Sequence, residues 1–164
     1  MNIGEICTRD VVFTDRGASL QQAAKMMRDR HVGTLLVTGD SGDGPEVVGI
    51  VTDRDVVVDA VARGLDVTQA EIGQLASDEL AAVPMEASID EAISAMKERR
   101  VRRLLVEDDG AVYGVVSLDD LLDALTHEMS ELSRAARGGI EREAAERTSF
   151  GEAPQVPIRV HIAD

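Results

Sequence analysis

The sequence predicts an α+β fold, a mixed α/β protein made of two tandem copies of one β-α-β-β-α unit. The first observation is self-similarity at an offset of 69 residues, so that Ser19 and Leu20 return as Ser88 and Ile89. The second is that both copies carry the same succession of extended and helical patterns. The third is the composition of the 164 residues, 44% hydrophobic and 29% charged, which is typical of a globular protein with its own core.

The repeat sets the expected domain organisation. After a hairpin loop that is four residues shorter in the second copy, residues 49–52 correspond to residues 114–117. We expect a first unit at residues 1–66, a second at 67–130, and a helical extension with a C-terminal tail at 131–164. The matched positions include Ile3 with Ile72, Ala23 with Ala92, Met27 with Met96 and Leu35 with Leu104.

Each element of the unit has a local signal. Ser19 and Ser88 are placed as helix N-caps, and Gln22 and Glu91 complete a capping box in each copy. Apolar residues three and four apart then predict one buried face on the helix that follows. The expected extended segments are 11–13, 34–37 and 47–51, then 80–83, 103–106 and 112–116; final helices begin near Thr52 and Ser117, the first ending near Gly64.

Charge and cysteine content limit the classes of function. The net charge of −14, from 17 basic and 31 acidic residues, repels nucleic acids and anionic membranes, so neither is an expected partner. Cys7 is the single cysteine, which excludes an internal disulfide and fits a reducing compartment. Because the N-terminal residues carry no basic-then-apolar pattern and no apolar run suits a membrane span, we expect a cytoplasmic protein.

The junction between the last strand and last helix of each copy carries a hydroxyl residue followed three positions later by aspartate. These residues are Thr52 and Asp55 in the first copy, and Ser117 and Asp120 in the second. The local interpretation is a helix N-cap. The ligand interpretation is that a hydroxyl at a helix N-terminus favours phosphate, while the aspartate accepts the hydroxyls of a ribose. A glycine three residues before the hydroxyl suits close approach of a ligand or backbone.

Arginines gather ahead of the second copy's central strand. Arg99, Arg100, Arg102 and Arg103 place four cations within five residues of a strongly acidic chain. A solvated surface explains the first two. Arg102 and Arg103, at the mouth of a buried strand, are better placed to meet a phosphate.

Enzymatic and metal chemistry find little support. His31, His127 and His161 are far apart and lack the spacing of metal ligands. Cys7 has no neighbour in sequence that would activate it as a nucleophile. We therefore expect neither a catalytic residue nor a metal site.

The doubled unit, with Gly-x-x-Thr/Ser-x-x-Asp closing each copy, resembles a pair of CBS domains, the regulatory module named after cystathionine β-synthase. The resemblance covers about residues 1 to 130. It implies two units packed about a pseudo-two-fold axis with two clefts between them. It also implies that adenine nucleotides are the class of ligand, with AMP, ADP and ATP as candidates, and that no catalytic cofactor is needed.

The resemblance also assigns site residues. In family members that bind adenosine nucleotides, the Thr/Ser contacts phosphate or ribose and the aspartate holds the ribose; here these are Thr52 with Asp55 and Ser117 with Asp120. Basic residues before the central strand would meet phosphates, and at that position the second copy has Arg102 and Arg103 where the first has uncharged Gly33 and Thr34. The second site is therefore favoured, while Thr34 is also expected among the ligand-binding residues. The residues expected to surround the base are Thr8, Asp10 and Val12, with their counterparts Ser77, Glu79 and Ala81.

Two functions follow as expectations. The first is a regulatory protein that binds an adenine nucleotide or related adenosyl ligand and senses energy or stress state. The alternative is a ligand-free homodimeric scaffold that regulates an unidentified partner protein. The last helix supports the homodimeric scaffold, because its apolar residues recur at steps of four and three and fit a homodimer seam. That seam comprises Leu118, Leu122, Leu125, Met129, Leu132 and Ala136; we expect Gly138 and Gly139 to interrupt the helix, and residues 156–162 to form an edge strand.

Overall fold

The computed structural model describes residues 1–40, 42, 44–76 and 80–149. Residues Met1–Leu122 form one compact unit, and the chain from Asp123 onward belongs to a second. The expected strand at 156–162 lies outside the described residues. The two units are treated separately below.

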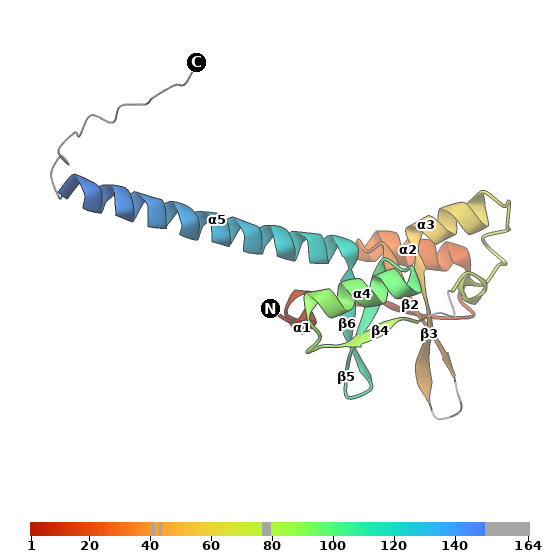
Figure 1. Ribbon diagram of the computed structural model, residues 1–164. Helices are drawn as coiled ribbons and strands as arrows, with labels where there is room; N and C mark the ends of the chain where they lie inside the picture. The colour runs from red at the N-terminus through yellow and green to blue at the C-terminus, as the bar shows by residue number, and fades with distance from the viewer. Residues whose placement is uncertain (41, 43, 77–79, 150–164) are drawn as a thin grey trace, which may run out of the picture. The chain divides into compact units, whose positions relative to one another are not determined.

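Both copies of the repeat form the same three-stranded sheet with the same topology, which confirms the α+β fold (Figure 1). In each, a short first strand pairs in parallel with the central strand, and the central strand pairs with the third in an antiparallel hairpin. A register shift falls at equivalent places, after Val37 and after Val106. The elements are β1 (Phe13–Asp15), α2 (Leu20–Arg30), β2 (Thr34–Asp40) and β3 (Pro45–Thr52), then β4 (Ala82–Pro84), α4 (Ile89–Arg99), β5 (Arg103–Asp108) and β6 (Ala111–Ser117).

The first helix of each copy begins and ends as its sequence predicts. Ser19 and Ser88 accept a hydrogen bond from the backbone of the third helical residue, whose side chain bonds back to the cap, so both capping boxes are confirmed. His31 and Arg100 close the two helices in the left-handed region, each with φ of 56°. The repeat is thus reproduced down to the helix ends.

The final helices of the two copies differ. In the first copy α3 (Asp53–Asp55) continues into a π-helical segment, η1 (Val56–Val61), and the turn that follows contains Gly64 at φ 71°. In the second copy α5 (Leu118–Ser149) runs for 32 residues. The expected interruption at Gly138 and Gly139 is wrong, because α5 passes through both. None of the helices that the structure describes has the length and apolarity to cross a membrane.

The short segments that precede the two sheets are exchanged between the copies. We define the first arm as residues 2–9, which contain α1 (Ile3–Ile6), and the second arm as residues 69–76, which contain η2 (Ile72–Gln74). The first arm packs on the second copy: the backbone N–H groups of Ile3 and Gly4 donate to Ala87 and Met85 at 2.9 and 2.8 Å.

The second arm packs in the same way on the first copy. The N–H groups of Ile72 and Gly73 donate to the carbonyl oxygens of Ala18 and Arg16 at 2.8 and 2.9 Å. Ile72 is fully buried and joins the core cluster formed by α2, β2 and β3 of the first copy. Each packed half therefore consists of one copy's sheet and helices together with the other copy's arm, and the boundary at residues 66 and 67 stays a prediction about the repeat.

Candidate functional site

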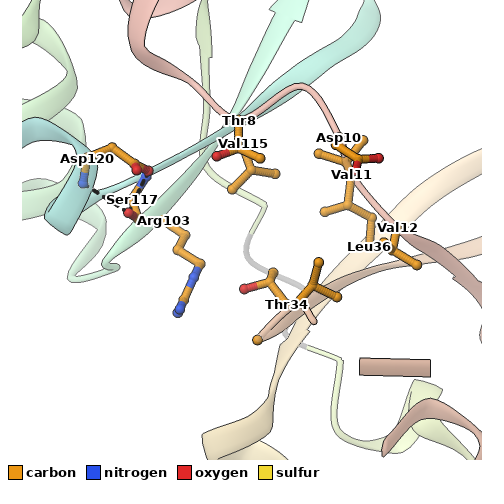
Figure 2. Close-up of a pocket in the computed structure, with 12 residues that line it drawn as sticks. Thr8, Asp10, Val11, Val12, Thr34, Leu36, Arg103, Val115, Ser117 and Asp120 are labelled. Atoms are coloured by element: carbon orange, nitrogen blue, oxygen red, sulfur yellow. Dashed lines mark hydrogen bonds between the residues drawn. The ribbon is translucent and has the colours of Figure 1, made fainter. Parts of the chain in front are cut away.

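A cavity of about 240 Å³ lies within the Met1–Leu122 unit, lined by residues of both copies. Figure 2 shows Ser117, Asp120 and Arg103 on one side of it, and the segment around Val11 and Val12 on the other. The arm exchange explains this double origin, because it brings the first arm against the last strand of the second copy.

The Ser117–Asp120 box forms the polar corner of the cavity. Ser117 Oγ donates to Asp120 Oδ2 at 2.6 Å, and the Ser117 backbone N–H donates to the same oxygen at 2.7 Å. In return, the Asp120 N–H donates to Ser117 Oγ at 3.2 Å. These bonds fix the carboxylate through Oδ2. The other oxygen, Oδ1, accepts no hydrogen bond from the residues that the structure describes.

Arg103 stands next to this box because of strand register. It is the first residue of β5, and its direct partner across the antiparallel pair is Ser117. Its side chain is half-buried and extends into the open space of the cavity in Figure 2. Within the described part of the chain, the guanidinium has no hydrogen bond or ion pair, which leaves its donors available to a ligand.

The first arm contributes Thr8 to the cavity lining and is attached to β6. Thr8 and Val115 form an isolated antiparallel bridge. Arg9 adds a hydrogen bond of 3.1 Å to the Gly4 carbonyl and lies over the ring of Tyr113, 4.6 Å from its centre.

Gly114 is required for the close approach of the arm to β6. A Cβ atom at this position would lie 2.7 Å from the Thr8 carbonyl oxygen and 2.9 Å from Cys7 Sγ. The expectation that this glycine allows close backbone approach is therefore confirmed, the approaching backbone being the first arm.

Seven of the residues predicted for ligand contact line this one cavity, although contact itself stays a prediction. They come from the first arm and the residues after it, from β2 and β5, and from the second copy's strand-to-helix junction. They are Thr8, Asp10, Val12, Thr34, Arg103, Ser117 and Asp120.

Arg102 does not line the cavity. Its side chain is 71% exposed and pairs with Asp119 at 3.7 Å. Successive side chains along an extended chain point to opposite sides, so only one of Arg102 and Arg103 can face the ligand space. In the structure Arg103 lines the cavity.

The first copy's junction repeats the hydrogen bonds of the second without lining this cavity. Asp55 Oδ2 accepts from the Thr52 N–H and hydroxyl, both at 2.8 Å. Of the residues expected beside it, Ala81 is only 6% exposed and its carbonyl accepts from Leu105, whereas Ser77 and Glu79 lie outside the described residues. A ligand cleft beside Thr52 and Asp55 therefore stays a prediction.

Sequence reasoning missed most of the apolar lining. Strand period was the available signal for two of these residues: Val115 shares a face of β6 with Ser117, and Leu36 shares a face of β2 with Thr34. No comparable signal marked the rest, since they lie in irregular or turn segments. The missed lining residues are Val11, Val32, Gly33, Leu36 and Val115.

Candidates for metal and thiol chemistry are the His, Cys, Asp and Glu side chains in the part of the chain that the structure describes. Among the described residues, no group of three His, Cys, Asp or Glu side chains is placed to hold a metal ion. Burial raises the pKa of the Cys7 thiol above its ordinary value, although the nearby Arg9 guanidinium opposes the shift. A raised pKa makes this thiol a weaker nucleophile at neutral pH.

Comparison with known proteins gives a consistent result. The model of the CBS domain family matches residues 3–59 and 72–127. Hypoxic response protein 1 of Mycobacterium tuberculosis is 35% identical over 121 residues, which is 74% of this chain and 78% of that protein. A crystal structure of Hypoxic Response Protein I with two coordinated zinc ions superposes with a TM-score of 0.62 at 32% identity, covering 75% of this chain and 98% of the other.

A more distant structure shares the fold alone. It is a CBS domain pair in complex with methylthioadenosine and S-adenosyl-L-methionine, with a TM-score of 0.66 at 19% identity, covering 78% of this chain and 98% of that one. The doubled β-α-β-β-α unit, the family model and the mycobacterial relative agree. The chain belongs to the CBS domain family, as a regulatory protein built on one CBS pair.

Proposed function

We propose that this CBS pair senses an adenosyl ligand carrying at most one phosphate, and that it binds this ligand in the cavity beside Ser117, Asp120 and Arg103. The observation that carries the proposal is the fixed Asp120 carboxylate with one unused oxygen, beside an arginine without a partner in the described chain. This pair of groups suits a ribose and a phosphate on one small molecule.

Asp120 is suited to hold the ribose. Two donors from Ser117 hold Oδ2 in place, so the orientation of Oδ1 is fixed before a ligand arrives. A charged acceptor that is already oriented loses little side-chain entropy when it binds the ribose hydroxyls. The same bonds define a helix N-cap, so capping and ligand binding use different oxygens of one carboxylate.

Charge limits the number of phosphates. Asp10 and Asp120 contribute two negative charges to the cavity lining, and Arg103 contributes its single positive charge. A monophosphate carries about −2 at pH 7, and Arg103 can offset part of it. Each further phosphate adds negative charge that no other lining residue offsets, on a chain of net charge −14. AMP or an uncharged or cationic adenosyl compound is therefore favoured over ATP.

The base would lie against aliphatic side chains. Val11, Val12 and Val115 line the cavity, and none of its lining residues is aromatic. Binding of adenine here depends on burial of its faces rather than on ring stacking. A cytoplasmic location is part of the proposal, because the single cysteine of the sequence fits a reducing compartment.

The test is calorimetric titration with AMP, ATP and methylthioadenosine, using Asp120→Asn and its matched control Asp55→Asn. Loss of a hydrogen bond to a charged acceptor is worth about 1.5–3 kcal/mol, so Asp120→Asn should weaken AMP binding about ten- to a hundredfold. Asp55→Asn makes the same change in the same local motif and should leave the affinity unchanged. Unaltered AMP affinity in Asp120→Asn would show that the cavity is not the site.

The second candidate is a ligand-free homodimeric scaffold that regulates another protein. The observation that favours it is the exposed apolar surface of α5, where Met129 and Leu132 are each 71% exposed. This function predicts no thermal shift across the nucleotide panel, together with loss of self-association when the chain is truncated after Glu128. A thermal shift with AMP would instead support the sensor, because a ligand that binds only the folded state stabilises it.

A further inference from the structure

The part of α5 that follows Asp123 carries a continuous apolar stripe. Leu125, Met129, Leu132 and Ala136 recur at steps of four, three and four residues, the spacing of a coiled-coil seam. Met129 and Leu132 are 71% exposed, and Ala136 is exposed as well. The CBS family model ends at residue 127, so most of this stripe lies beyond the family's module.

A partner would stabilise such a helix by covering its apolar stripe. Isolated helices shorter than about 12–15 residues are marginal in water, and most helical stability in proteins comes from packing of an apolar face. Gly138 and Gly139 add a penalty of about 1 kcal/mol each relative to alanine, yet the helix continues through them to Ser149. Side-chain pairs along the helix, such as Arg134 with Glu131, contribute only a few tenths of a kcal/mol.

The charge distribution selects the direction of that partner. Residues 123–131 contain three carboxylates, on Asp123, Glu128 and Glu131, and no Lys or Arg. Residues 134–142 contain three arginines and one glutamate. A parallel copy would place the acidic segments together, whereas an antiparallel copy places each acidic segment beside an arginine-rich one.

Side-chain size along the stripe selects the same direction. The large residue Leu125 stands near one end of the stripe and the small residue Ala136 at the other, with Met129 and Leu132 between them. In an antiparallel pair Leu125 of each copy meets Ala136 of the other, and Met129 of each copy meets Leu132 of the other. In a parallel pair, alanine would face alanine and leave a gap, which packing disfavours.

We propose that residues 123–142 of α5 form an antiparallel coiled coil with a second copy of this chain. Leu125 of one copy faces Ala136 of the other, and Met129 of one copy faces Leu132 of the other. The inference concerns the helix alone and is independent of ligand binding in the cavity.

Disulfide trapping in the full chain tests both the association and its direction. In a Cys7→Ser background, the double variant Leu125→Cys/Ala136→Cys should form covalent dimers under mild oxidation. The single variant Leu125→Cys should not, because in the antiparallel pair its two copies are 11 residues apart along the axis, about 16 Å. A disulfide requires Cα atoms within about 7 Å of each other. His127→Cys, on the outer face of the helix, is the control for random collision.

Each outcome of the trapping is decisive. Covalent dimers in the double variant alone support the proposal. Covalent dimers in the single variant Leu125→Cys as well as in the double variant show a parallel pair and overturn the direction. No dimer above the His127→Cys control overturns the association itself.

Sedimentation velocity gives a second measure that needs no cysteine. Met129→Glu/Leu132→Glu buries two charges in the proposed seam and should reduce the mass of the assembly at concentrations where the parent chain self-associates. His127→Glu introduces the same residue on the outer face and should leave the mass unchanged. An unchanged mass in the seam variant contradicts the proposal, whatever other surfaces the chain uses to associate.

Discussion

Thr8 and Val115 exchange two backbone hydrogen bonds, of 2.9 and 3.0 Å, and thereby join the first arm to the strand that ends at Ser117. The two residues lie 107 positions apart in the chain and in different copies of the repeat. Both also line the cavity. A ligand bound there as proposed would contact the arm of one copy and the helix start of the other, so its binding would be sensitive to the attachment of the arm.

Because the first arm packs closely on β6 at Gly114, we expect Gly114→Ala to lower the stability of the fold. The added Cβ would meet the Thr8 carbonyl at 2.7 Å, so either the arm or β6 must shift. Overpacking of this kind is worth about 1–3 kcal/mol of stability. Denaturant unfolding should show that loss. Gly33→Ala is the matched control, because its Cβ would lie 3.4 Å or more from its neighbours and should change stability little.

Arg103→Ala should separate binding from stability. Because Arg103 has no partner within the described residues, its removal should leave the melting temperature of the unliganded protein nearly unchanged. If AMP binds as proposed, its affinity should fall about ten- to a hundredfold, the value of a charge-assisted hydrogen bond, while adenosine loses little. Arg102→Ala is the control, since it removes only the surface pair with Asp119. An equal loss for AMP and adenosine in Arg103→Ala would contradict a phosphate contact.

The second capping box should respond to acid and the first should not. Hydrogen bonds from the Ser88 N–H and hydroxyl lower the pKa of Glu91 below the ordinary value of 4.5. A lowered folded-state pKa gives stability that is present above the unfolded value and is lost as the pH falls through the folded value. Gln22 holds the same place in the first copy without titrating.

The corresponding variant is Glu91→Gln, which copies the first box into the second. Between neutral pH and pH about 3, the melting temperature of this variant should decrease less than that of the parent chain. The reverse change, Gln22→Glu, should make the decrease larger. Identical pH profiles for all three chains would mean that the boxes do not contribute to acid sensitivity.

Replacing the paired glycines should strengthen α5. Gly138→Ala and Gly139→Ala each remove a helix penalty of about 1 kcal/mol, and an added Cβ meets no atom within 4 Å at either position. Helical content by circular dichroism should hold to higher temperature. Gly64→Ala is the contrasting variant, because its φ of 71° is strained for alanine and the change should destabilise. A fall in helical content in the α5 variants would contradict the continuous helix.

Local patterns predicted the local parts of this fold well. The Ser19 and Ser88 capping boxes are confirmed because every atom they need lies within three residues. The prediction at Gly138 and Gly139 failed for a related reason. Glycine propensity is a small local penalty, and the strong helix formers around it outweigh that penalty over a long helix.

The site was harder to predict than the helices because the residues that line it are brought together by the exchange of arms between the copies. Nothing in the sequence near Thr8 indicates that it packs on β6 of the other copy. Similarly, Arg102 and Arg103 look equivalent in the sequence. Side chains alternate along an extended chain, so Arg102 faces solvent and Arg103 faces the cavity. The residue types were recognisable, but the copy from which each would come was not.

The exchange of arms has a consequence for any protein built from one repeat alone. Such a protein would have no second sheet on which to dock its arm, and its own core would lack the isoleucine that the other arm supplies. It could close its core by exchanging arms with an identical molecule. Two repeats in one chain make the same exchange within a single molecule, and each arm and strand-to-helix junction can then differ between the copies, as Arg103 and its uncharged counterpart Thr34 do.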